Sequence, residues 1–96
     1  MFEIRKTDDF ADWFEDLRDR VTRVRIQARI DRMERGNFGD VAPVGEGVSE
    51  ARLHFGAGYR LYFVQHGQTL VVLLAGGDKS TQANDIRLAL ELARQL

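Results

Sequence analysis

The N-terminal third of this chain carries apolar residues at the spacing of helices. In residues 10–21 they recur every three or four positions, which places them on one face of a helix: Phe10, Trp13, Phe14, Leu17 and Val21. Asp8 and Asp9 stand just before this segment and supply N-cap chemistry. Residues 20–35 continue at the helical period and predict a second helix, for which Gly36 is a suitable stop.

The second predicted helix has two apolar stripes, one formed by Ile26, Ile30 and Met33 and the other by Val21, Val24 and Ala28. Two stripes predict contact with both the first helix and a sheet. Arginines project between the stripes at positions 25, 29 and 32. Because the arginine run of residues 18–35 alternates with acidic residues, a solvated helix face with i,i+4 pairs explains it better than RNA contact does.

The pattern changes to that of strands near residue 40. Alternating or continuous apolar positions predict strands at 2–5, 41–44, 48–55, 59–65 and 69–75, with Pro43 in an edge strand. The connectors at 56–58 and 66–68 are short enough for antiparallel hairpins. A last helix is expected over 82–95, with Thr81 as N-cap. We therefore predict a single domain over residues 1–96 of the α+β class, with two N-terminal helices packed on an antiparallel sheet and a C-terminal helix.

Composition narrows the functional classes. The chain of 96 residues is 44% hydrophobic and 30% charged, as is usual for a globular domain, and its net charge of −1 does not indicate a nucleic-acid binder. It has no cysteine and two histidines, which argues against disulfides, a thiolate site or a histidine-rich metal centre. Residues 1–5 lack a signal-peptide core, and the longest apolar run, 70–75, is too short to span a bilayer. We expect a cytoplasmic protein that needs no cofactor.

Strand alternation gathers polar residues on one face of the predicted sheet. If the apolar faces of two hairpin strands meet the helices, the opposite surface carries Arg52, His54, Arg60 and Tyr62, with Lys79 at its rim. Such a surface would form a compact anion site with aromatic and titratable character. A half-exposed sheet also places ordinary solvated side chains there, so both interpretations stand at this point.

The segment Gly76-Gly77-Asp78-Lys79-Ser80-Thr81 lies between a predicted strand and a helix, where glycines can cradle a phosphate. Asp78 occupies the place of the second glycine of a P-loop, which argues against an NTPase. A glycine turn followed by a Thr81 cap is as good an explanation as a phosphate contact by Lys79.

Two short motifs carry a resemblance to a known family. They are Gly-x-Gly-Tyr-Arg-x-Tyr at 56–62 and Gly-Gly-Asp-Lys-Ser-Thr-Gln at 76–82, and they follow Gly-Asn-Phe-Gly-Asp at 36–40. With the first helix and residues 29–32, these motifs resemble the HigB-like addiction-module killer proteins of the RelE/ParE toxin superfamily. The resemblance extends over nearly the whole chain.

The resemblance implies two helices laid on an antiparallel sheet, and a toxin that enters the ribosomal A site and cuts messenger RNA without metal. It also implies silencing by a cognate antitoxin, a helix-turn-helix protein encoded beside the toxin. Contact with DNA would then occur only through the antitoxin complex, and no membrane is involved. On matching positions, Arg52, Arg60 and Lys79 are the basic catalytic residues, with Tyr62 nearby.

The expected chemistry is attack of an RNA 2′-OH on the adjacent phosphorus, which leaves a 2′,3′-cyclic phosphate and a 5′-OH. Arg52 and Arg60 would bind phosphate oxygens, Lys79 would also contact the RNA, and Tyr62 would stack on a base. His54 is the general base by this interpretation, because its ordinary pKa is close to neutrality. Two alternatives stay open: a toxin that inhibits a protein such as DNA gyrase, and an inactive homologue that only binds its antitoxin.

Overall fold

The computed structural model describes all 96 residues and has the predicted α+β architecture. Its strands and helices follow the chain in this order: β1 (Glu3–Lys6), α1 (Asp8–Asp16), α2 (Arg20–Glu34), β2 (Val41–Gly45), β3 (Val48–Leu53), β4 (Tyr59–His66), β5 (Leu70–Gly77), the 3-10 helix η1 (Lys79–Thr81) and α3 (Gln82–Arg94). The strands form one sheet in the order β1-β5-β4-β3-β2. All neighbours are antiparallel except β1, which pairs parallel to β5 and makes the sheet mixed.

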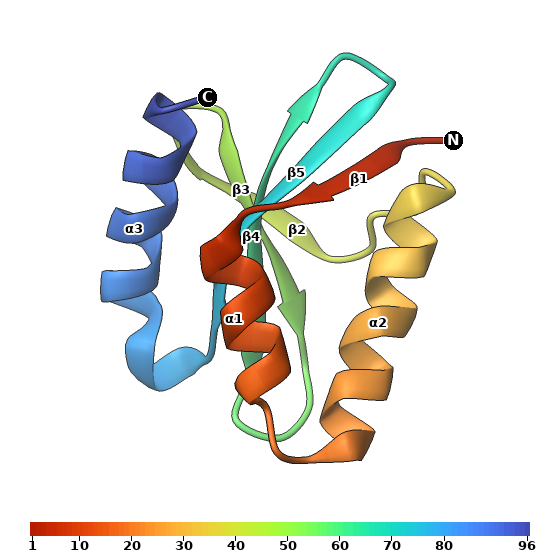
Figure 1. Ribbon diagram of the computed structural model, residues 1–96, viewed down its shortest axis with the longest axis vertical. Coiled ribbons are helices and arrows are strands. Elements are labelled where there is room, and N and C mark those ends of the chain that lie inside the picture. The colour runs from red at the N-terminus through yellow and green to blue at the C-terminus, as the bar shows by residue number, and fades with distance from the viewer.

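The sheet lies between two helical layers, with α1 and α2 on one face and α3 on the other (Figure 1). The face under α1 and α2 holds the larger core cluster, which consists of Phe10, Ile26, Ile30, Met33, Ala51, Leu53, Leu61, Phe63, Val71 and Leu73. Successive residues of a strand alternate between this cluster and the α3 side, as period-2 geometry requires. The predicted inward face of β3 and β4 is therefore confirmed.

The helix boundaries differ from the expectation at one joint. Thr7, rather than Asp8 or Asp9, caps α1, because its hydroxyl accepts a hydrogen bond from the backbone N–H of Phe10. The helix ends at Asp16, so Val21 belongs to α2 and is 61% exposed. The prediction that Val21 continues the first apolar stripe is wrong. The second stripe of α2 faces solvent as well, because Val24 and Ala28 are also exposed.

The second face of the sheet is covered by α3. A smaller cluster lies there and consists of Val48, Tyr62, Val64, Val72, Leu74, Ala75 and Ala89. The register of β4 and β5 shifts between Tyr62 and Phe63, and this irregularity places the successive residues Leu74 and Ala75 in the same cluster. The face of the sheet that was expected to be open to solvent is thus partly covered by α3.

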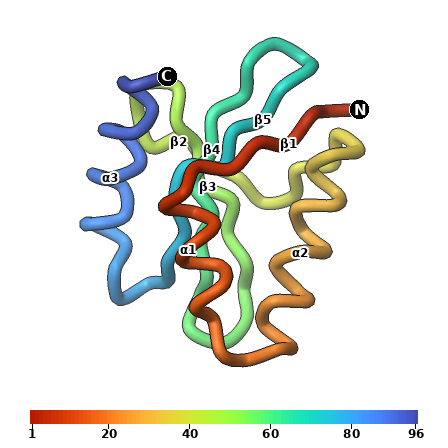
Figure 2. The backbone as a smooth tube through the Cα atoms, in the orientation of Figure 1, coloured from red at the N-terminus to blue at the C-terminus, as the bar shows by residue number.

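Gly76 and Gly77 lie inside β5 rather than in a turn, which corrects the phosphate-loop and glycine-turn interpretations. Both glycines are required by close packing: a Cβ on Gly76 would lie 2.1 Å from the Trp13 ring, and one on Gly77 would lie 1.7 Å from the Asp85 carboxylate. The chain then turns into η1 and α3 at the end of the molecule remote from both termini (Figure 2). None of the helices has the length and apolar character needed to cross a bilayer.

Candidate active site

The two sequence motifs meet in space, at the end of the sheet where the β3–β4 connection and η1 lie. The backbone N–H of Lys79 donates a hydrogen bond to the carbonyl oxygen of Ala57 at 3.3 Å. Gly58 has a φ of +76°, and a Cβ there would lie 2.9 Å from Cγ of Lys79. The glycine therefore serves both a left-handed turn and the close approach of the lysine.

A shallow pocket of about 300 Å³ lies at this contact. Three of the predicted site residues line it, His54, Arg60 and Lys79, and the rest of the wall is the segment 55–58. No carboxylate lines the pocket, so two permanent cations and a titratable ring dominate its charge. Arg52 and Tyr62 do not line it.

Arg60 is the buried cation of the pocket. It is only 7% exposed, and it pairs with the buried Glu50 through an Nε–Oε1 distance of 3.4 Å without forming a hydrogen bond. Oε1 of Glu50 accepts its hydrogen bond from Nε2 of Gln82 instead. Nε and Nη1 of Arg60 are buried without hydrogen-bond partners. Unsatisfied buried donors are costly, so this guanidinium is held at a cost in stability while its positive charge lies beside the pocket.

His54 is oriented by Asp40, a residue to which the sequence analysis gave no role. The His54 Nε2 atom lies 2.5 Å from Asp40 Oδ2, and Nη2 of Arg52 donates to Asp40 Oδ1 at 2.8 Å. Because an ionised carboxylate only accepts hydrogen bonds, Nε2 carries the proton and Nδ1 is left to exchange one. The Arg52 hydrogen bond, followed by that of His54, lowers the pKa of Asp40 from 3.8 to about 2.

Arg52 is therefore engaged by Asp40 rather than directed into the pocket. The same ion pair raises the pKa of its guanidinium. In this structure Arg52 holds the carboxylate that contacts His54, and its role in binding phosphate stays a prediction.

Arg29 of α2 holds the backbone around Asp40 and His54 in place. Its buried guanidinium donates to three backbone carbonyl oxygens, those of Phe38 at 3.0 Å, Arg52 at 2.9 Å and Asp40 at 2.8 Å. Burial lowers the pKa of Arg29. The helix α2 is thereby tied to the segment before β2 and to the end of β3, which are the segments that carry Asp40 and His54.

Tyr62 is not available to RNA, and its predicted stacking role is wrong. The side chain is fully buried beneath α3, and its hydroxyl has no hydrogen-bond partner. Burial, followed by the nearby carboxylates of Glu50 and Asp85, raises the pKa of Tyr62. Strand alternation placed Tyr62 on the correct face, but only the packing of α3 shows that this face is closed over it.

Comparison with known proteins identifies one relative. The chain is 44% identical over 94 residues to a protein of Haemophilus influenzae whose function is uncharacterized, and the match covers 98% of this chain and 95% of that protein. The chain belongs to the same family as that protein. No protein-family profile matches the chain. No solved structure matches it either.

The remaining polar groups near the pocket are structural. Asp78 caps η1 by accepting hydrogen bonds from the backbone and the hydroxyl of Ser80, which explains an acidic residue in the apparent phosphate motif. Thr81 is the N-cap residue of α3, as predicted, but its side chain makes no capping hydrogen bond, since its hydroxyl bonds to Asp85. No three His, Asp or Glu side chains gather in a way that could hold a metal ion.

Asp40, Glu50 and Arg29 were missed because their partners are far away in sequence. Asp40 ends the Gly-Asn-Phe-Gly-Asp motif at 36–40, but no pattern of neighbouring residues indicates that it contacts His54. The connection comes from the pairing of β2 with β3, in which Ala51 opposes Val41, next to Asp40.

Proposed function

We propose that this protein is a toxin of a type II toxin-antitoxin module, of the RelE/ParE superfamily, that cleaves messenger RNA at the ribosome. The observation that carries the proposal is the buried guanidinium of Arg60, which has unpartnered nitrogens and lines a pocket with His54 and Lys79. The pocket offers two cations and a proton acceptor to a phosphodiester, which is what the transfer of RNA phosphorus to its own 2′ oxygen requires.

The geometry supports the following roles. Nδ1 of His54 takes the proton of the 2′-OH, while Asp40 holds the ring through Nε2 and stabilises the imidazolium that forms. The 2′ oxygen then bonds to phosphorus, and the bond from phosphorus to the 5′ oxygen breaks. Arg60 binds the phosphoryl oxygens as their charge grows. Lys79 offsets the charge on the departing 5′ oxygen, which takes a proton from water.

The shallowness of the pocket supports a substrate that is held by a larger partner. A pocket of about 300 Å³ contacts a single nucleotide at most, so orientation of the strand would come from the ribosome. The proposal therefore places the protein in the cytoplasm, with translated messages as substrate and a cognate antitoxin of the helix-turn-helix class as partner.

The test is brief induction in bacteria followed by mapping of mRNA 5′ ends by primer extension. Wild-type protein is expected to produce new ends within translated messages, and Lys79→Gln to reduce them by about 10²–10³-fold if it acts as one charge-stabilising donor. Lys79 is exposed, so this variant is expected to keep the fold. Arg60→Ala is expected to abolish cleavage, but it also leaves Glu50 buried without a cation.

Arg87→Gln is the matched control, because Arg87 is an exposed cation on α3 that does not line the pocket. Cleavage by Lys79→Gln at the level of wild type and the control would refute the proposed site. Growth arrest with intact messages would refute the nuclease and point to a protein target.

An exposed apolar stripe on α2 favours that second candidate, a toxin that binds and inhibits a protein such as DNA gyrase. Val21 and Val24 are 61% and 59% exposed and lie three residues apart, so they are neighbours on the surface of α2. This candidate predicts that Val21→Ser combined with Val24→Ser abolishes growth arrest while Lys79→Gln does not.

A further inference from the structure

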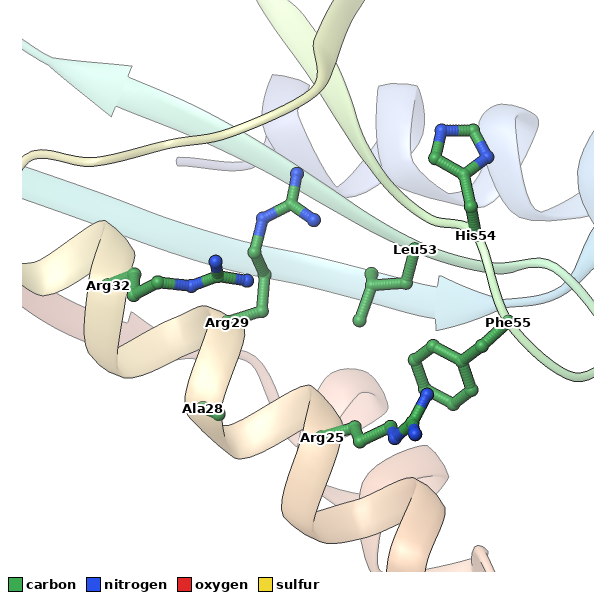
Figure 3. A pocket seen from close by; sticks show the side chains of 7 residues that line it. All are labelled: Arg25, Ala28, Arg29, Arg32, Leu53, His54 and Phe55. Carbon is green, nitrogen blue, oxygen red and sulfur yellow. The ribbon is translucent and has the colours of Figure 1, made fainter.

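A second pocket, of about 280 Å³, adjoins the candidate active site between α2 and the end of β3 (Figure 3). The two pockets share His54 and Phe55, so they adjoin at these two residues. The second pocket has an apolar wall, to which Phe55 and Leu53 contribute, and a basic wall formed by arginines of α2.

The arginines of this pocket differ in their engagement. Arg29 donates its hydrogen bonds to three backbone carbonyl oxygens. Arg25 and Arg32 are exposed, and neither has a carboxylate within ion-pair distance. Cζ of Arg25 lies 4.8 Å from the centre of the Phe55 ring, so the guanidinium is placed by a cation–π contact, as Figure 3 shows.

The Phe55 ring also packs against Tyr59, whose ring centroid is 5.4 Å away. A guanidinium stacked on a supported aromatic ring presents its remaining face to a further planar group. Arg32 adds an unpaired charge on the same face of α2, about two turns along, at i+7 from Arg25. The combination of a planar cation, an apolar wall and a second free charge suits a nucleobase followed by a phosphate. An isolated phosphate or carboxylate would leave the apolar wall without a contact.

We infer that this pocket binds the base of a nucleotide that flanks the cleaved phosphodiester, by stacking on the Arg25 guanidinium. The inference rests on the proposed function and deepens it, because it identifies single-stranded RNA as the ligand that reaches both pockets. His54, at the junction, then stands between the base and the reacting phosphate.

The test measures binding of a 2′-O-methyl adenine trinucleotide, which cannot be cleaved by 2′-OH attack, to the full chain by NMR titration. The same trinucleotide is made with an abasic residue at each position in turn. In the wild type, one abasic position is expected to weaken binding by about 5–150-fold, the range for loss of one stacked base. Arg25→Gln is expected to bind intact and abasic trinucleotides equally.

Arg20→Gln is the matched control, since it removes one exposed charge from the same helix outside the pocket and is expected to keep the discrimination. Equal binding of all trinucleotides by the wild type, or undiminished discrimination by Arg25→Gln, would overturn the inference. Absence of any trinucleotide binding would overturn it too. Lys79→Gln separates the two proposals. If this variant binds the intact trinucleotide as tightly as the wild type and still distinguishes it from the abasic ones, the base pocket is supported and the proposed cleavage site is contradicted.

Discussion

Removal of the Arg29 guanidinium should unfold the segment that carries Asp40 and His54 more readily than any exposed change on α2. Methionine keeps much of the side-chain length and apolar stem, but it cannot donate hydrogen bonds. Of the three carbonyl oxygens that Arg29 contacts, that of Asp40 retains a second donor, the backbone N–H of Arg52 at 2.9 Å. The carbonyl oxygens of Phe38 and Arg52 lose the hydrogen bonds donated by Arg29.

The magnitude follows from those two oxygens. A buried polar group left without a partner costs about 1–3 kcal/mol. The variant also no longer buries a charged guanidinium, and the desolvation cost saved in this way offsets part of the loss from the two oxygens. We expect Arg29→Met to lower the free energy of unfolding by about 2–4 kcal/mol. For a domain of this size, that corresponds to a fall in Tm of about 10–30 °C.

The assay is urea denaturation followed by the fluorescence of the one tryptophan, Trp13, and by far-UV circular dichroism. Arg32→Met is the control, because Arg32 lies on the same helix but is exposed and has no ion pair. We expect the control to stay within about 0.5 kcal/mol of the wild type. Equal stability losses in the two variants would refute the role of Arg29 as a clamp.

Two further predictions concern the polar groups around the site. The pKa of Asp40 is depressed from 3.8 to about 2 in the folded protein. Its ionised carboxylate therefore contributes its full stabilisation at a pH above its pKa in the unfolded chain, and this contribution is lost as the pH falls toward 2. The stability difference between wild type and Asp40→Asn, measured by urea unfolding, should therefore be constant near pH 6 and shrink below pH 4; a difference that persists at pH 2 would contradict the ion-pair assignment. Tyr62→Phe should raise the free energy of unfolding by about 1 kcal/mol, because it removes a buried hydroxyl that has no partner, and should leave growth arrest unchanged. A loss of arrest in a stably folded Tyr62→Phe protein would restore a functional role to the hydroxyl.

Periodicity and turn chemistry were enough to predict most of the secondary structure. The helical spacing of Ile26, Ile30 and Met33 and the alternation around Leu61 and Phe63 identify the residues that form the larger core. These patterns are local, since they depend only on 3.6 residues per helical turn and on two per strand repeat. The same locality explains the error at Val21, because the spacing continues across a helix break that lies at Leu17–Asp19.

The sequence alone also placed His54, Arg60 and Lys79 in one candidate site, the first two by strand alternation and the third by its position after a strand. Alternation gave the face of the sheet on which His54 and Arg60 lie, and chain position put Lys79 near that face. Tertiary structure decided what each side chain contacts. Tyr62 is covered by α3, and the pairing of β2 with β3 brings Asp40 to His54 and Arg52. The position of η1 packs Lys79 against Gly58. The physical reason is that these contacts join segments many residues apart, so they depend on how the completed layers pack rather than on any repeat in the chain.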